Sequence, residues 1–234
     1  MSLEKRVVII SGATGVTGKL AAQKFAALGA SLVLLGTDQT RLDALTRELH
    51  LPEERILTFA ADLTEREAVL ALAVTVQAKF KRADILLHLV GGWTGGKTLV
   101  ETPLEEMQNM LNQHLWTTFH MTQAFLPQLT ENGWGRIIVI SSPLAVQPTA
   151  KMGAYAVGKA AEETLLLTLA QETKESGVTA NILQVRSIDT KNPSTSSGQV
   201  SKGTKPEEIV EKILYLCTDD ASAAINGQRI ALFA

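Results

Sequence analysis

The chain has 234 residues, of which 45% are hydrophobic and 20% charged, and its 22 Lys and Arg residues nearly balance 24 Asp and Glu residues. This composition excludes a disordered chain, and the formal net charge of −2 gives no electrostatic reason to expect nucleic acid or an anionic membrane as a partner. A single cysteine, Cys217, excludes an internal disulfide and any metal site built on several thiolates. Because no stretch reaches the roughly 18 apolar residues that span a bilayer, we expect a cytoplasmic protein.

Short runs rich in β-branched residues alternate along the chain with longer amphipathic segments. In chain order, the predicted strands are residues 6–10, 31–35, 55–60, 84–90, 136–140, 178–185 and 228–232. The predicted helices are residues 17–28, 40–49, 64–80, 103–129, 152–175 and 206–216. Strands that are apolar on both faces and alternate strictly with helices predict a mostly parallel sheet covered on both sides. We therefore expect a single doubly wound α/β domain over residues 1–234 with about seven strands.

A glycine loop follows the first predicted strand and precedes the first predicted helix. Gly12, Gly15 and Gly18 stand three residues apart in it. Glycine permits a tight turn and lets the backbone approach a pyrophosphate, and the N-terminus of the next helix offers free N–H groups and a positive dipole end. The loop predicts dinucleotide binding, and an ordinary strand–helix turn is the alternative.

Three residues late in the chain suit acid–base chemistry. Tyr155 and Lys159 are four residues apart, so they share one helix face. A phenol has a pKa near 10, and a neighbouring lysine cation lowers it by favouring the phenolate. Ser142 stands at the end of the fifth predicted strand and could donate a hydrogen bond to a carbonyl oxygen. Taken alone, Tyr155 and Lys159 could equally be an ordinary helix-surface pair.

Over nearly its full length the chain resembles the short-chain dehydrogenase/reductase family. The resemblance rests on the glycine loop, on Asp62 and Gly91, and on Ser142, Tyr155 and Lys159 at the family's spacing. It implies a Rossmann domain and a hydride transfer between NAD(P)(H) and a carbonyl or alcohol. In that reaction Tyr155 is the acid/base, Ser142 orients the carbonyl and Lys159 holds the nicotinamide ribose. The cofactor-binding residues that it implies are Gly12, Thr14, Gly15, Val16, Gly18, Thr37, Asp38, Asp62, Leu63, Val90, Gly91, Tyr155, Lys159 and Ile188.

The chain departs from the family pattern at several positions. His114 stands where the family has its fourth catalytic residue, an asparagine, so it is a catalytic candidate with a passive replacement as the alternative. Val185-Arg186 stands in place of a Pro-Gly pair. We expect Arg186 near the nicotinamide end, where it binds an acidic substrate or a cofactor phosphate or is merely solvated. Residues 191–205, where the family carries a substrate lid, are short and polar and predict a mobile substrate loop.

A second, local resemblance involves the segment Val90-Gly91-Gly92-Trp93-Thr94-Gly95-Gly96 and residues 112–117. Both look similar to dihydropteridine reductases, a divergent branch of the same family. Trp93 could stack on a flat heterocyclic substrate, or it could only cover the cofactor pocket. Quinonoid pterin reduction is therefore one alternative function. A dinucleotide-binding sensor or scaffold without catalysis is another, although Ser142 and Tyr155 at the family's spacing argue against it.

The residues after the second predicted strand bear on the choice of cofactor. An acid there would bind the ribose hydroxyls of NAD and repel the phosphate of NADP. By family alignment this acid belongs at Gly36 and the NADP-binding arginine at Thr37, while Asp38 is one step further and could still reach the ribose. Because Gly36 and Thr37 leave room and a hydroxyl for a phosphate, we predict NADP(H) over NAD(H).

The expected partner is a small-molecule carbonyl or alcohol, without nucleic acid, membrane or metal. No histidine has a second ligand at useful spacing for a metal. The family resemblance implies a homodimer or homotetramer formed through the predicted helices 103–129 and 152–175.

Overall fold

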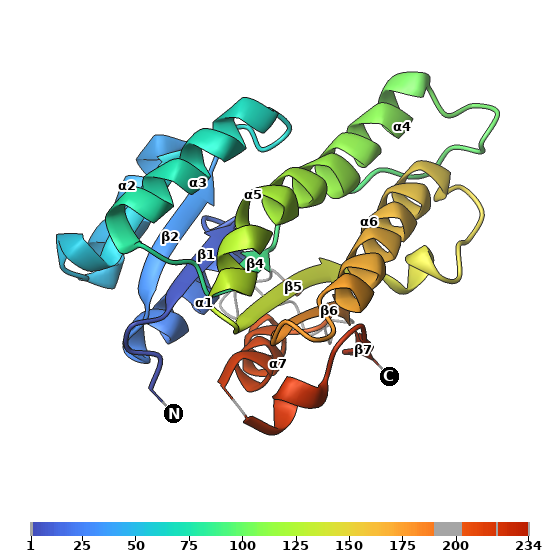
Figure 1. Ribbon diagram of the computed structural model, residues 1–234. Helices are drawn as coiled ribbons and strands as arrows, with labels where there is room; N and C mark the ends of the chain where they lie inside the picture. Colours follow the sequence, from blue (N-terminus) through green and yellow to red (C-terminus); the bar gives the residue numbers. More distant parts are fainter. Residues whose placement is uncertain (1, 190–202, 219, 234) are drawn as a thin grey trace, which may run out of the picture.

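The structure is a computed structural model that describes residues 2–189, 203–218 and 220–233 (Figure 1). Its strands are β1 Val7–Ser11, β2 Ser31–Gly36, β3 Ile56–Ala60, β4 Ile85–His88, β5 Gly135–Ser141, β6 Val178–Gln184 and β7 Arg229–Ala231. Its α-helices are α1 Val16–Ala27, α2 Gln39–Leu49, α3 Arg66–Phe80, α4 Leu104–Leu111, α5 Thr117–Glu131, α6 Gly153–Glu172 and α7 Pro206–Thr218. Shorter helical turns are η1 Glu53–Arg55, η2 Asn112–Trp116, η3 Pro143–Ala145 and η5 Asp220–Ala224.

The seven strands form one sheet in the order β3-β2-β1-β4-β5-β6-β7, and every pairing is parallel. The sheet therefore confirms the predicted fold class. From β1 the chain proceeds to one edge through β2 and β3, and then returns to build the other half from β4 onward. The point between β1 and β4 is the topological switch point, and ligands of open α/β sheets bind beyond the carboxyl ends of the strands there.

Helices cover both faces of the sheet. Successive residues of a strand point to opposite faces, so Val8 and Ile10 of β1 pack in the core beneath α1, α2 and α7, while Val7 and Ile9 pack beneath α3, α5 and α6. Figure 1 shows α5 and α6 on the same side of the sheet, with α4 extending beyond it. Both faces are apolar, which explains why the strand sequences do not alternate with polar residues.

The predicted helix 103–129 is interrupted in the structure. Between α4 and α5 the chain forms one π-helical turn, η2. The hydroxyls of Thr117 and Thr118 donate to the carbonyl oxygens of Gln113 (2.8 Å) and His114 (2.6 Å), four residues earlier in each case. Such bonds compete with the helical ladder and bend helices, and π turns often occur at functional sites. The turn brings His114 into the interior, where its side chain is fully buried.

Most of the predicted mobile loop, residues 191–205, lies outside the described residues. Within the described parts of the chain, no helix is both long enough and apolar enough to cross a membrane.

Candidate functional site

Two adjoining cavities open at the carboxyl ends of the strands. They have volumes of about 670 Å³ and about 410 Å³ and share Leu89, Val90 and Gly91, which follow β4. Of the predicted cofactor residues, the larger cavity is lined by Gly12, Thr14, Gly15, Thr37, Asp62, Leu63, Val90 and Gly91. The smaller is lined by the predicted residues Val90, Gly91, Trp93, His114, Tyr155, Lys159, Arg186 and Ile188. Predicted residues far apart in the sequence thus converge on one continuous hollow.

The glycine loop packs too closely for side chains. Gly12 has a φ of +71°, and a Cβ there would lie 2.9 Å from the Leu89 carbonyl oxygen. A Cβ on Gly18 would lie 2.2 Å from the Gly12 carbonyl oxygen. Helix α1 begins after Gly15 without a side-chain cap, so the N–H groups of its first turn are available to an anion beside the cavity. The loop therefore fits a dinucleotide pyrophosphate.

Three predicted cofactor residues do not line either cavity. Val16 is half exposed at the start of α1, and Gly18 is buried in the loop packing. Asp38 is the N-cap of α2, where its Oδ1 accepts the backbone N–H of Arg41 at 3.1 Å. The charged side chain that does line the larger cavity beside Gly36 and Thr37 is Arg41.

Arg41 is a residue that the sequence analysis missed. Its Nη2 donates to the Thr14 carbonyl oxygen at 2.9 Å, which holds the guanidinium over the glycine loop. The position of Arg41 shortly after the second strand is a sequence signal for this role. Only the fold, however, shows that the first turn of α2 places Arg41 at the cavity. On the other side of this cavity, Asp62 Oδ1 accepts both the N–H (2.9 Å) and the hydroxyl (2.7 Å) of Thr64.

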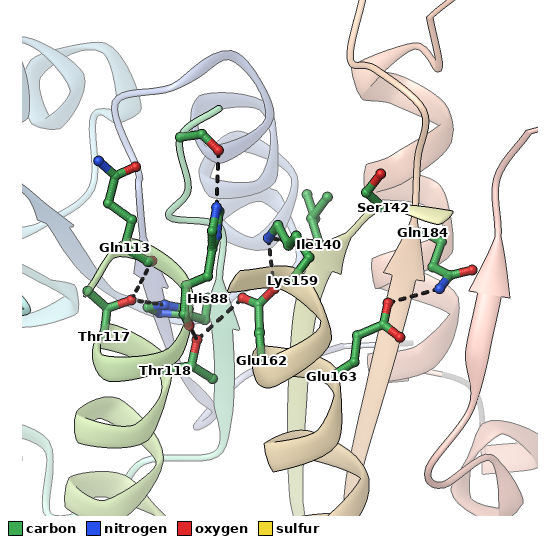
Figure 2. Close-up of polar contacts among 12 residues, drawn as sticks. His88, Gln113, Thr117, Thr118, Ile140, Ser142, Lys159, Glu162, Glu163 and Gln184 are labelled. Carbon is green, nitrogen blue, oxygen red and sulfur yellow. Dashed lines mark hydrogen bonds and ion pairs between the residues drawn. The ribbon is translucent and has the colours of Figure 1, made fainter. Parts of the chain in front are cut away.

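Lys159 and Tyr155 project from α6 into the smaller cavity, as their four-residue spacing predicts. The Lys159 side chain is nearly buried, and its Nζ donates to the Ile140 carbonyl oxygen (2.6 Å) and to Glu162 Oε2 (2.7 Å) (Figure 2). The ammonium is thereby fixed between the end of β5 and its own helix.

His114 reaches the same cavity from the π-helical turn. Its Nε2 lies 3.1 Å from the Gly92 carbonyl oxygen, which can only accept, so Nε2 carries the proton and Nδ1 is the bare nitrogen. Among the described residues, Nδ1 has no hydrogen-bond partner. The ring lies edge-on to Tyr155 with centroids 5.6 Å apart. Desolvation, aided by the nearby Lys159 charge, lowers the pKa of His114 to about 3, so the imidazole is neutral at physiological pH.

His88, at the end of β4, is buried beneath the cavity floor. Its Nδ1 lies 2.8 Å from Ser11 Oγ. Its Nε2 lies 3.1 Å from Thr117 Oγ1 (Figure 2). Desolvation and the Lys159 charge lower the pKa of His88 to about 3. The neutral ring thus ties β1 and β4 to the start of α5.

We expect this neutral histidine to make stability fall in mild acid. The pKa of His88 in the folded protein lies below its unfolded value of about 6.5, so the unfolded chain binds the proton first. The contribution of neutral His88 to the free energy of unfolding is complete above about pH 6.5. It is lost as the pH falls, by about 2 kcal/mol at pH 5. Urea unfolding at pH 7.5 and pH 5 measures it. His88→Gln should reduce the difference by about that amount, and His50→Gln, at the exposed end of α2, should not; equal pH dependence in all three proteins contradicts the assignment.

Ser142, just past the end of β5, is buried, and its Oγ accepts the N–H of Leu144 at 3.3 Å. The residue that lines the smaller cavity is its neighbour Ser141, whose Oγ has no partner among the described residues. Accepting one bond leaves the Ser142 hydroxyl proton available to a second acceptor. The catalytic role of Ser142 stays a prediction.

The glycine-rich loop with Trp93 closes one side of the smaller cavity. Trp93 lines the cavity and is 66% exposed. The loop is fastened further along, because the Thr94 hydroxyl donates to Glu106 of α4 (3.2 Å) and the Gly96 N–H donates to the Lys151 carbonyl oxygen (2.8 Å). An exposed aromatic ring on an anchored loop can contact a ligand without being part of the core.

On the opposite side of that cavity stand the residues after β6. The Arg186 guanidinium lies over the Phe233 ring, 5.0 Å from its centroid, and also lines the cavity. Ile188 lines it as well and forms an isolated parallel bridge with Thr204. Both therefore line the cavity that contains Tyr155 and Lys159.

A parallel sheet with a glycine loop at its switch point defines a Rossmann-type protein. The chain belongs to the short-chain dehydrogenases, because the model of the short chain dehydrogenase family matches residues 6–199. A 3-oxoacyl-[acyl-carrier-protein] reductase from Thermotoga maritima is 26% identical over 99% of this chain and 98% of its own. The crystal structure of a short chain dehydrogenase from Bacillus anthracis is similar with a TM-score of 0.85 and 25% identity, over 99% of this chain and 96% of that one.

A third match concerns the fold. A 7α-hydroxysteroid dehydrogenase in complex with NADH and 7-oxo glycochenodeoxycholic acid has the same fold, with a TM-score of 0.85 over 98% of this chain and 93% of that one, at 24% identity. Members of the family use nicotinamide cofactors and act on small molecules. The chain is accordingly an oxidoreductase of this family.

Proposed function

We propose that the protein transfers a hydride between NADP(H) and a small carbonyl or alcohol substrate, with Tyr155 as the acid/base. The observation that supports this best is the joining of two cavities, one over the glycine loop and one containing Tyr155 and Lys159. A dinucleotide bound along the first would present its nicotinamide to the second. The nicotinamide supplies or accepts the hydride, and everything else is done by side chains of the chain.

In the direction of reduction, Tyr155 donates its phenolic proton to the carbonyl oxygen as negative charge develops there. Ser142 donates a hydrogen bond to the same oxygen and orients it. Lys159 stabilises the phenolate that remains and holds the nicotinamide ribose hydroxyls. His114, neutral and with its bare Nδ1 without a partner among the described residues, accepts a hydrogen bond rather than donating a proton.

The preference for NADP(H) is attributed to Arg41. Its guanidinium lies beside Gly36 and Thr37, and a guanidinium recognises a phosphate through paired hydrogen bonds. We expect Arg41→Ala to weaken NADPH binding about tenfold while changing NADH binding less than about twofold. Fluorescence titration of both cofactors measures this. Arg47→Ala is the matched control, because Arg47 is on the same helix but does not line the cavity. Tenfold tighter binding of NADH than NADPH by the unaltered protein overturns the preference.

The substrate is proposed to lie between Trp93 and Arg186, which line the smaller cavity. An aromatic ring and a guanidinium suit a flat or acidic carbonyl compound. A panel of ketones, quinones and quinonoid pterins assayed with NADPH and NADH tests the function. Turnover of pterins alone favours the pterin reductase alternative. Cofactor binding without turnover of any compound favours a sensor or scaffold and contradicts the proposal.

We also propose a homodimer or homotetramer formed through α4, α5 and α6. These helices carry exposed apolar side chains at Leu104 and Val157, and Trp116 in the turn between α4 and α5 is exposed as well. Burying such residues is a common reason for self-association. A monomeric mass by light scattering at working concentration would refute it.

A further inference from the structure

A buried carboxylate contacts the lysine of the proposed site. Glu162 lies one turn after Lys159 on α6 and is fully buried. Its Oε2 accepts the Lys159 ammonium at 2.7 Å, and its Oε1 lies 3.3 Å from the hydroxyl of Thr118 (Figure 2). The first contact is a charge-assisted hydrogen bond between an ammonium and a carboxylate.

The other titratable groups near Lys159 do not balance the charge of its ammonium, which leaves Glu162 as the counterion. His88 from β4 and His114 from η2 are neutral, since desolvation lowers both pKa values to about 3. Tyr155 lines the same cavity as Lys159. Glu163, the remaining acid, is turned to the other side of α6, where it bonds Gln184 (2.8 Å) and Arg229 (2.5 Å). Arg186, which follows β6, lines that cavity as well.

Burial works against both charges of the pair. Desolvation raises the pKa of Glu162, and the ammonium of Lys159 opposes that rise. In turn, a buried ammonium without a counterion loses its proton at a much lower pH than a solvated one. The Ile140 carbonyl is a dipole and compensates only part of the charge. An ammonium that is 4% exposed therefore needs Glu162 as its counterion.

We propose that Glu162 is a positioning residue, which keeps the Lys159 ammonium charged and fixed at the cofactor-binding edge of the site. The inference rests on the proposed function of Lys159 as a ribose ligand. Thr118 provides a further contact to Glu162, because its hydroxyl lies against both Glu162 and the His114 carbonyl oxygen. The carboxylate is thereby contacted from the first turn of α5 as well as from its own helix.

The test is cofactor binding as a function of pH, which needs no substrate. NADPH and NADH affinities are measured by calorimetry at pH 6.5 and pH 9 for the unaltered protein, Glu162→Gln, Glu163→Gln and Lys159→Met. Glu163→Gln is the matched control, since it makes the same change at the next buried acid. We expect Glu162→Gln to bind within about threefold of the unaltered protein at pH 6.5 and about tenfold more weakly at pH 9, because its lysine loses the proton between these values. The unaltered protein and Glu163→Gln should change by less than about threefold.

The possible outcomes separate this inference from the proposed function. If Lys159→Met binds both cofactors normally, the role of Lys159 and the proposed function fail together. If Lys159→Met binds weakly but Glu162→Gln follows the unaltered protein at both pH values, only the role of Glu162 is overturned. A loss in Glu162→Gln that is equal at both pH values indicates a structural role alone and also overturns it.

A second variant serves if Glu162→Gln does not fold. Glu162→Asp keeps the charge but ends one methylene short of Lys159. We expect it to bind cofactor about two- to fivefold more weakly at pH 9 than at pH 6.5, between the unaltered protein and Glu162→Gln. Affinity identical to that of the unaltered protein at both pH values contradicts the proposal.

Discussion

Tyr155→Phe is expected to lower kcat by about 10³-fold on any substrate that the unaltered protein reduces, with cofactor affinity unchanged within about threefold. Phenylalanine keeps the aromatic ring that packs edge-on against His114 and removes only the hydroxyl. The loss in kcat therefore measures the contribution of the proton donor separately from the binding of the dinucleotide. Steady-state kinetics and cofactor titration on the same preparation measure both quantities.

Tyr215→Phe is the matched control for this experiment. Tyr215 is the other tyrosine of the chain and lies exposed on α7, away from the lining of both cavities. We expect it to retain full activity. Full activity in Tyr155→Phe would remove Tyr155 from the mechanism. A drop in cofactor affinity as large as the drop in kcat would assign Tyr155 to binding rather than to proton transfer.

The fold could be predicted from the sequence because local patterns determine it. Each strand is a short apolar run and each helix is amphipathic, so strict alternation leaves a parallel sheet as the consistent arrangement. Gly12, Tyr155 and Lys159 could be placed for a similar reason. A glycine loop after the first strand and two residues four apart on one helix have positions that follow from the element that carries them.

What the sequence analysis missed depends on individual side-chain contacts. Two carbonyl oxygens of the π-helical turn accept threonine hydroxyls from the first turn of α5, within a pattern that otherwise predicts a continuous helix. Arg41 reaches the cavity only once α2 has folded back over the glycine loop. Glu162 is one of several acids on its helix in the sequence, and its burial follows from the packing of α6 against α4 and the π-helical turn. Spacing along the chain carries no signal for such contacts.

The largest effect on stability is expected at Asp84, at the end of the sheet opposite the cavities. This fully buried carboxylate accepts hydrogen bonds from Arg6 Nη1 (2.8 Å), Arg82 Nε (2.8 Å) and the backbone N–H of Val7 (2.9 Å). It thus ties β1 to the start of β4 at their amino-terminal ends. Asp84→Ala should lower the free energy of unfolding by about 3 kcal/mol, because it leaves a buried N–H unpaired and two guanidinium groups without their counterion.

A loss of this size corresponds to a fall in Tm of about 6 to 12 °C for a domain of this length, which scanning calorimetry resolves. Glu48→Ala is the control, since it breaks an exposed ion pair with Lys19 at 3.9 Å and should cost less than about 0.5 kcal/mol. A change below about 1 kcal/mol in Asp84→Ala would show that solvent replaces the lost contacts at the partly exposed arginines. Because Asp84 lies at the amino ends of the strands and both cavities lie at the carboxyl ends, the folded fraction of Asp84→Ala should bind cofactor normally. The same sheet therefore separates the group on which its stability depends from the groups proposed to perform its chemistry.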